Sequence, residues 1–233
     1  MATGRAELQA NAEIPHSTTR AEASGAYRTR KSRDHRLQAI WHFVTDFGDT
    51  AVTVPLVGLM VGFLLAARRP RLAIGWGLAI LGGASAVAAL KLVLSACGHP
   101  LNGFGLSSPS GHTAMSISVY GGFAAVIATT LTRPARVAVI AGTAALIIAI
   151  ALSRIILNYH STIEVAVGLV VGIAALAIIV AIVARHPPQR PSLGWLGAGA
   201  LVVCALFHGT QWPAEQAIDR LARWLDFVRP WCS

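Results

Sequence analysis

The sequence predicts an all-α fold: a polytopic helical bundle in a membrane, with about six transmembrane helices and interfacial helices near both ends. Of its 233 residues, 55% are hydrophobic and only 12% are charged, which is about half the charged fraction of an average soluble domain. The mean hydropathy is +0.60. The apolar residues occur in long blocks separated by short polar loops. Such blocks are typical of membrane-spanning helices and exclude a soluble globule as the main body of the chain.

The two ends of the chain are more polar than its centre. Residues 1–36 contain seven basic and four acidic side chains without apolar periodicity, and they are predicted to form a disordered basic tail. Residues 37–48 form an amphipathic segment that is too short to cross a bilayer, so it is expected to lie at the interface. Residues 211–233 carry tryptophans among balanced charges and are predicted to form a second interfacial amphipathic segment.

Six apolar blocks between these ends are the predicted transmembrane spans. The first and the last are the shortest, and the last is rich in glycine. Their lengths suit helices that cross the hydrocarbon core of a bilayer. The predicted spans are 51–67, 72–95, 111–131, 136–157, 162–184 and 193–210.

The basic residues predict the orientation of these spans. A net charge of +9 could indicate a nucleic-acid partner. Most basic residues outside the tail instead lie in short loops, so no nucleic acid is expected to bind. Three arginine-containing loops, 68–71, 132–136 and 185–190, share one face if every span crosses once. The positive-inside tendency makes that face cytoplasmic, so loops 96–110 and 158–161 open on the other side. Six spans also place the basic tail outside, which leaves the side of the tail open.

Few ionisable residues remain near the predicted membrane depth, and most lie close to the outer ends of the spans. Such residues are costly in a bilayer and mark functional sites by default. Between residues 72 and 184, apart from the arginine loop, the charged residues are Lys91, Arg154 and Glu164. Three histidines belong to the same layer: His99, His112 and His160. The polar groups are therefore expected to converge on one face.

This set of side chains suits an anion. Ser110 is positioned to cap a helix that begins there, and Gly111 lets a ligand approach the exposed N–H groups at the helix start. Arg154 supplies a planar fork for phosphate oxygens and Lys91 a mobile point charge. Two imidazoles beside such a pocket provide a nucleophile and a proton donor.

The motif "PSGH" at 109–112, followed by "SRIILNYHSTIE" at 153–164, resembles the type 2 phosphatidic acid phosphatase (PAP2) superfamily. The family pattern is Lys with Arg-Pro downstream, then Pro-Ser-Gly-His, then Ser-Arg, five residues, His, three residues and Asp. The match covers roughly residues 91–164, and the flanking spans fit the family's six-helix fold. The resemblance therefore implies a PAP2-like transmembrane phosphatase domain over residues 37–210, acting on lipid phosphates without a metal.

The resemblance also implies a role for each matching residue. His160 is the nucleophile that forms a phosphohistidine, and His112 protonates the leaving oxygen. Glu164 occupies the position of the family's aspartate, beside the nucleophile. The residues implied to hold the phosphoryl oxygens are Lys91, Ser110, Gly111 and Arg154. No metal and no cofactor is expected, and the expected partners are the lipid phosphate substrate and the surrounding lipids.

The sequence departs from the family pattern in two places. Glu164 is one methylene longer than Asp, so reduced or altered activity is expected rather than its loss. After Lys91 the chain reads "LVLSACGHP", which places His99-Pro100 where Arg-Pro is usual, one residue late. His99 is either a weaker, pH-dependent phosphate donor, or that contact is missing.

Some of these residues also have simpler structural explanations. Ser110 fits a helix cap, and Ser161 with Glu164 fits a capping box that leaves Glu164 free to orient His160 as well. Lys91 could extend along the helix so that its charge reaches the interface.

The favoured function is hydrolysis of a lipid-linked phosphate or diphosphate monoester at the periplasmic face of a bacterial inner membrane. One alternative is a phosphotransferase that passes the phosphoryl group to another lipid. The other is a catalytically weak member that binds anionic lipids. The sequence favours no particular lipid.

The two implied imidazole roles predict a bell-shaped pH dependence of kcat/KM. His160 has to be neutral to attack phosphorus, whereas His112 has to be protonated to donate, so the rate falls on both sides of an optimum. Initial rates measured from acid to alkaline pH would check this, and a flat profile would contradict the assigned roles.

Overall fold

The computed structural model describes residues 35–97, 106–186, 193–212, 216–218 and 220–221. The chain divides into two compact units, residues 1–40 and residues 41–233. Within the described ranges the regular structure is helical and contains no strand, so the predicted all-α fold is confirmed. Residues 35–46, which include most of the predicted interfacial segment, are helical. Residues 1–34 of the predicted tail 1–36 and most of the predicted segment 211–233 lie outside the described residues, whereas residues 35–36 of the tail are helical.

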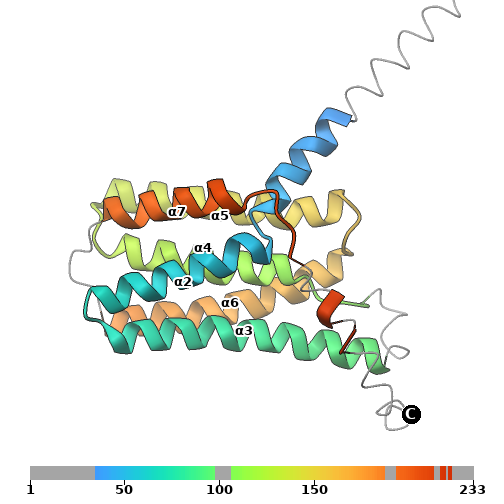
Figure 1. The fold of residues 1–233 in the computed structure, drawn as a ribbon, viewed down its shortest axis with the longest axis horizontal. Helices are drawn as coiled ribbons and strands as arrows, with labels where there is room; N and C mark the ends of the chain where they lie inside the picture. The colour runs from blue at the N-terminus through green and yellow to red at the C-terminus, as the bar shows by residue number, and fades with distance from the viewer. Residues whose placement is uncertain (1–34, 98–105, 187–192, 213–215, 219, 222–233) are drawn as a thin grey trace, which may run out of the picture. The chain divides into compact units, whose positions relative to one another are not determined.

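Six long helices follow in the second unit, and each overlies one of the predicted apolar blocks (Figure 1). They are α2 (Thr50–Ala66), α3 (Pro70–Cys97), α4 (Gly111–Ala128), α5 (Arg133–Ile156), α6 (Thr162–Arg185) and α7 (Leu193–Phe207). The predicted boundaries agree with the observed ones to within a few residues.

Several of these helices are long and apolar enough to cross a membrane. Among the described residues, four stretches qualify by length and composition: His35–Ala66, Pro70–Ser95, Arg133–Ile156 and Thr162–Arg185. A shorter apolar helix covers Gly194–Phe207. Large apolar side chains such as Leu78, Val137, Ile140 and Val170 are exposed on the outer faces, as expected for a protein surrounded by lipid. The chain is thus a helical membrane protein, and its six crossings stay a prediction.

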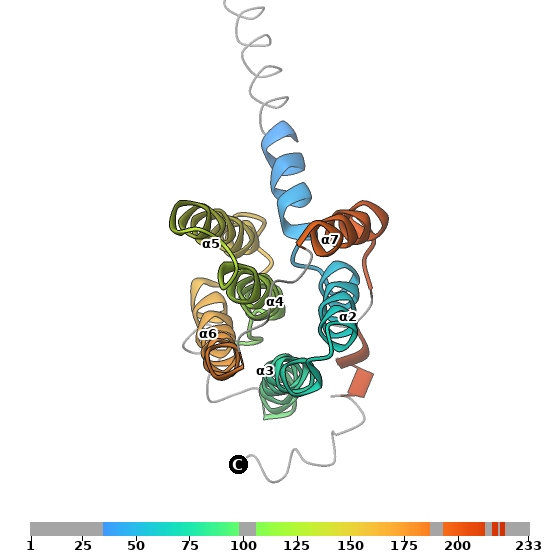
Figure 2. The same cartoon turned by 90° about the vertical axis from the view of Figure 1, so that its left-hand side faces the viewer.

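Helix α4 lies at the centre of the bundle, with α2, α3, α5 and α6 around it (Figure 2). Its most extensive contact is with α6. Gly168 and Gly172 make this contact possible, because a Cβ at Gly168 would overlap the Ser110 carbonyl oxygen and one at Gly172 would lie 2.9 Å from the Ala114 carbonyl oxygen. Small residues let helix backbones approach closely in membranes.

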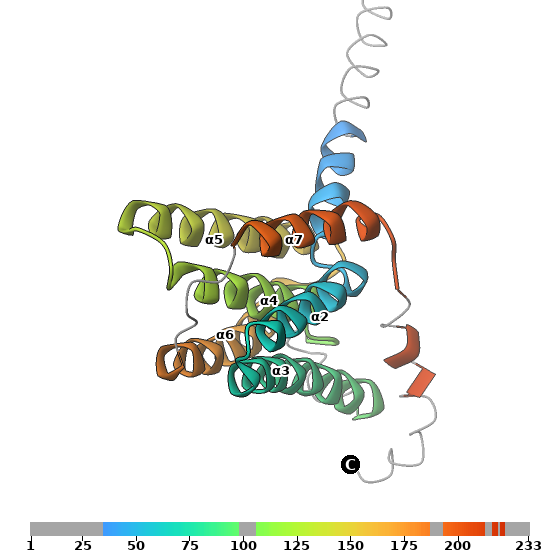
Figure 3. The same ribbon diagram turned by 60° about the vertical axis from the view of Figure 1, so that its left-hand side comes forward.

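The starts of α2, α4 and α6 share one end of the bundle with the ends of α3 and α5 (Figures 1 and 3). All three starts have a side-chain cap: Asp49 for α2, Ser110 for α4 and Ser161 for α6. Capping satisfies N–H groups that have no partner within the helix. Three positive helix ends therefore meet at this end, which we call the polar end.

The arginine-containing connections lie at the opposite end. The α2–α3 connection includes Arg68 and Arg69, α5 begins at Arg133, and α6 ends at Arg185. The fold thus separates the arginine loops from the predicted site residues, as expected if successive helices run in opposite directions. Which end faces the cytoplasm stays a prediction.

The close contact of α4 and α6 predicts a steric effect of Gly168→Ala. The added methyl group forces the helices apart at Ser110, and overpacking of this kind costs about 1–3 kcal/mol of unfolding free energy. Thermal unfolding in detergent should show a lower midpoint. Gly142→Ala on α5 is the matched control, because a Cβ there meets nothing within 4 Å. Equal midpoints for the two variants would contradict the packing argument.

Candidate active site

The polar end contains a cavity of about 590 Å³. Of the predicted site residues, four line it: Lys91, Gly111, His112 and Arg154. They come from α3, the start of α4 and the end of α5. Other lining residues come from the segment before α2 and from the α5–α6 connection: Thr45, Asp46, Gly48, Asp49 and Tyr159. Two cations and the imidazole of His112, which lie far apart in the sequence, thus share one cavity.

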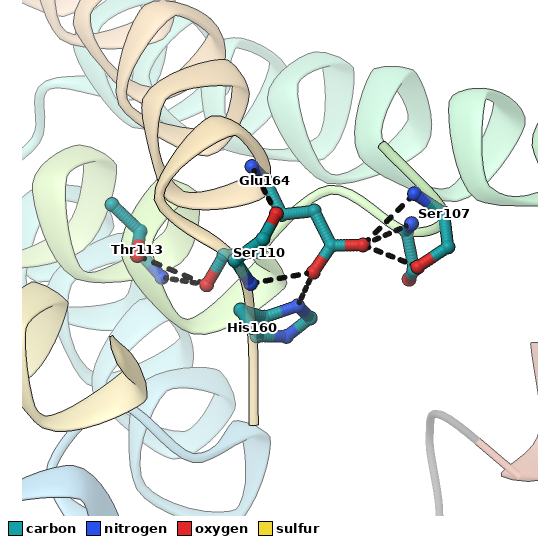
Figure 4. Close-up of polar contacts among 7 residues, drawn as sticks. Ser107, Ser110, Thr113, His160 and Glu164 are labelled. Atoms are coloured by element: carbon teal, nitrogen blue, oxygen red, sulfur yellow. Dashed lines mark hydrogen bonds and ion pairs between the residues drawn. The ribbon is translucent and has the colours of Figure 1, made fainter. Parts of the chain in front are cut away.

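His160 and Glu164 form a hydrogen-bonded pair beside this cavity (Figure 4). The Nδ1 atom of His160 lies 3.0 Å from Oε2 of Glu164. Because a carboxylate only accepts, Nδ1 carries the proton and Nε2 keeps its lone pair. The His160 side chain is 6% exposed. Within the described part of the chain, its Nε2 atom is buried and has no hydrogen-bond partner. This nitrogen is therefore available as a nucleophile.

The Glu164 carboxylate binds two segments at once. Its Oε1 atom accepts from the Ser107 N–H at 3.0 Å, the Ser107 hydroxyl at 2.5 Å and the Ser108 N–H at 2.7 Å. Its Oε2 atom accepts from the Ser161 N–H at 3.0 Å as well as from His160. The capping box and the contact with His160 thus occur together. The Glu164 side chain, one methylene longer than Asp, thus reaches both the Ser107–Ser108 loop and the ring of His160. Its catalytic role stays a prediction.

A turn after α5 brings His160 back to Arg154. Asn158 adopts a positive φ of 56°, and the His160 N–H donates to the Arg154 carbonyl at 3.1 Å. The Arg154 side chain is buried, and its Nη1 donates to the Thr45 hydroxyl at 3.1 Å. Its guanidinium lies over the Tyr159 ring, 4.4 Å from the ring centre. Arg154 is therefore held in place next to His160.

The surroundings of His160 favour its neutral form. Burial lowers the pKa of His160, and the positive charges of Arg154 and Lys91 lower it further. The hydrogen bond to Glu164 acts in the opposite direction without cancelling this effect. Because the ordinary pKa of histidine is about 6.5, His160 is mostly neutral at neutral pH.

Ser110 and Gly111 occupy different places at the start of α4. Ser110 is fully buried, its hydroxyl accepts from the Thr113 hydroxyl at 3.0 Å, and its N–H donates to the Glu164 carbonyl at 3.0 Å. It acts as the helix cap and joins α4 to α6. Gly111 lines the cavity, and a Cβ there would meet only Val87, at 3.9 Å. Phosphate binding by either residue stays a prediction.

Asp49 contacts His112, and sequence reasoning did not identify it. Its Oδ2 atom lies 3.6 Å from Nε2 of His112, and the two side chains are 12% and 14% exposed. The charged residues that the sequence singles out lie between residues 72 and 184, whereas Asp49 comes directly before the first apolar block. An Asp in front of an apolar block is the pattern of a helix cap. That signal alone could have placed a carboxylate at this end.

Two further predictions concern His99 and the absence of a metal. His99 lies outside the described residues, so its contact with phosphate stays a prediction. The residues that the structure describes contain no group of three or more His, Cys, Asp or Glu side chains that could hold a metal ion.

Comparison with known proteins gives the following matches. The family model described as the PAP2 superfamily matches residues 89–188, a stretch that contains Lys91, His112, His160 and Glu164. The chain is also similar to a curated protein of Klebsiella pneumoniae described as an uncharacterized 22.5 kDa protein in cps region. The two are 26% identical over 188 residues, which cover 78% of this chain and 90% of the relative. No solved structure matches the chain.

The lowered pKa of His160 predicts the position of the acid limb of the pH profile. Protonation of His160 removes its nucleophilic lone pair, so the rate falls as pH drops through its pKa, and the midpoint should lie below 6.5. Glu164→Gln removes the contact that raises this pKa, so the midpoint should move lower still. The maximal rate should fall about 100-fold or more, as when the orienting carboxylate of a triad is neutralised. A wild-type midpoint above 6.5 would contradict the electrostatic argument.

Proposed function

Residues 89–188 belong to the PAP2 superfamily, and on this premise we propose that the protein is a metal-independent phosphatase for lipid-linked phosphate or diphosphate monoesters. The observation that carries the proposal is the His160–Glu164 pair beside a cavity lined by Lys91, Arg154 and His112. It combines an oriented nucleophile, two cations for phosphate oxygens and a second imidazole. Phosphoryl transfer depends mostly on such positioning and charge stabilisation.

The first step of the proposed reaction forms a phosphohistidine. The Nε2 lone pair of His160 attacks phosphorus while Nδ1–H stays hydrogen-bonded to Glu164. The bond from phosphorus to the lipid oxygen breaks, and the leaving oxygen takes a proton from His112. Lys91 and Arg154 stabilise the charge on the remaining phosphoryl oxygens. Because Nε2 is buried, side chains of the cavity wall have to shift before a phosphoryl group reaches it.

The second step returns the enzyme to its starting state. Water attacks phosphorus in line with the bond to Nε2, and the neutral His112 accepts the proton that the water loses. The N–P bond breaks, inorganic phosphate leaves, and His160 regains its lone pair. The same histidine is thus acid in one step and base in the next.

The lining of the cavity supports a lipid substrate. Beyond its polar residues the wall is formed by apolar side chains of α2, α3 and α4, among them Val54, Ala84, Val87, Ala88 and Met115. A phosphate head group fits among the cations while the attached chain contacts this apolar wall. Several apolar helices place the protein in a membrane. We propose that this is a bacterial inner membrane and that the cavity faces the periplasm, because the arginine loops lie at the opposite end.

Phosphate release by the purified full-length protein tests this function. In detergent with EDTA, the wild-type protein should release phosphate from at least one of phosphatidic acid, phosphatidylglycerol phosphate and a polyprenyl diphosphate. His160→Ala should lower the rate about 10³-fold or more, because the nucleophile is lost.

His186→Ala is the matched control, since His186 is an exposed histidine at the end of α6, beside the arginine loop, and it should retain the rate. Equal release by wild type and His160→Ala, or release that requires a metal, would overturn the proposal. Chromatography of the lipid products with an added acceptor lipid separates hydrolysis from phosphotransfer.

A further inference from the structure

The short segment 45–49, directly before α2, forms part of the cavity wall next to His112. The Tyr120 hydroxyl donates to the Phe47 carbonyl at 2.5 Å and so attaches the segment to α4. A Cβ at Gly48 would lie 3.3 Å from Cδ2 of His112 and 2.8 Å from Ile150. The backbone at Gly48 therefore packs closely against the imidazole ring and limits its movement.

The two oxygens of Asp49 have different surroundings. Oδ1 accepts from the Ala51 N–H at 2.8 Å, which is the helix cap of α2. Oδ2 lies 3.6 Å from Nε2 of His112, which is longer than a hydrogen bond but within the range of an ion pair. A cap needs only one oxygen, and Asn or Ser would provide it equally well. One oxygen of Asp49 thus caps α2, while the other faces the ring of His112.

We propose that Asp49 is a positioning residue for His112, holding its ring in place for proton transfer through the contact between Oδ2 and Nε2. This inference rests on the proposed phosphatase function. When the bond from phosphorus to the lipid oxygen breaks and the bond to His160 forms, the proton passes from His112 to the leaving oxygen. Asp49 stays ionised throughout and takes no proton. Its Oδ2 atom lies next to Nε2 of His112, so the contact fixes the orientation of the ring that donates the proton.

Three other charged side chains, Lys91, Arg154 and Asp46, line the cavity and also contribute to the electrostatic field at His112. Lys91 and Arg154 line the same wall and oppose a positive charge on His112, whereas Asp46 adds a second negative charge. Asp46 has no hydrogen bond or ion pair to His112 among the contacts within the described residues. Asp49 is therefore the carboxylate that offsets the two cations at the ring itself, and Asp46 is a matched control.

The test compares two substrates that differ in their need for a general acid. The leaving group of dodecyl phosphate is an unstable alkoxide unless its oxygen is protonated. The leaving group of 4-nitrophenyl phosphate is a stable phenolate that needs no proton. Asp49→Asn keeps the helix cap but removes the charge. It should lower kcat/KM for dodecyl phosphate about tenfold or more and for 4-nitrophenyl phosphate less than about threefold, because general acids contribute roughly 10²–10⁴-fold where they are needed.

Two further variants define the effect. Asp46→Asn should change the ratio of the two rates less than Asp49→Asn does, because it removes a cavity charge that has no direct ion pair with His112. His112→Ala combined with Asp49→Asn should be no slower than His112→Ala alone, because both changes remove the same function. Equal losses on both substrates in Asp49→Asn would reduce Asp49 to a structural cap and overturn the inference.

A second measurement does not depend on activity. Diethyl pyrocarbonate modifies accessible imidazoles, so the modification of His112, followed by peptide mass spectrometry, should be faster in Asp49→Asn than in Asp46→Asn, because the ring is no longer held in place by its ion-pair partner. Equal rates would overturn the inference even if the wild-type protein released no phosphate. Absence of phosphate release from wild type would by itself overturn only the proposed function.

Discussion

The polar end of the bundle depends on one carboxylate, that of Glu164. It accepts hydrogen bonds from the loop at Ser107 and Ser108, from the start of α6 and from His160. The Glu164 carbonyl also accepts from Ser110 and so joins α6 to the start of α4. A buried carboxylate without such partners would be strongly destabilising. The same interactions that satisfy this charge also fix the ring of His160 and the loop before α4.

Each of the two imidazoles faces a carboxylate, but at different distances. His160 lies near Arg154 and Lys91, and burial together with these charges favours its neutral form. His112 instead faces the carboxylate of Asp49. In the proposed reaction one ring has to be neutral and the other protonated at the same pH. Glu164 orients the ring of His160 and Asp49 lies beside the ring of His112, so each of the two histidines in the proposed reaction has its own carboxylate partner.

The fold was largely predictable because long apolar blocks and short arginine loops determine the helices and their alternation. The motifs at 109–112 and 153–164 likewise identified His112, Arg154, His160 and Glu164, since their spacing is a property of the chain itself. The contacts of Asp49 and Ser107 were not predictable. They join segments more than fifty residues apart and have no periodicity, so only the packing of α4 against its neighbours brings them together.

The turn after α5 also bears on the order in which the site assembles. The pair of His160 and Glu164 and the return to Arg154 all lie within twelve consecutive residues, 153–164, so the hairpin of α5 and α6 contains this half of the chemistry by itself. Asp49, Lys91 and His112 arrive on earlier helices. During biosynthesis the chain thus inserts the acid first and the nucleophile later. The proposed site is complete only once α5 and α6 pack against α4, so phosphatase activity would report that the bundle has assembled in the bilayer.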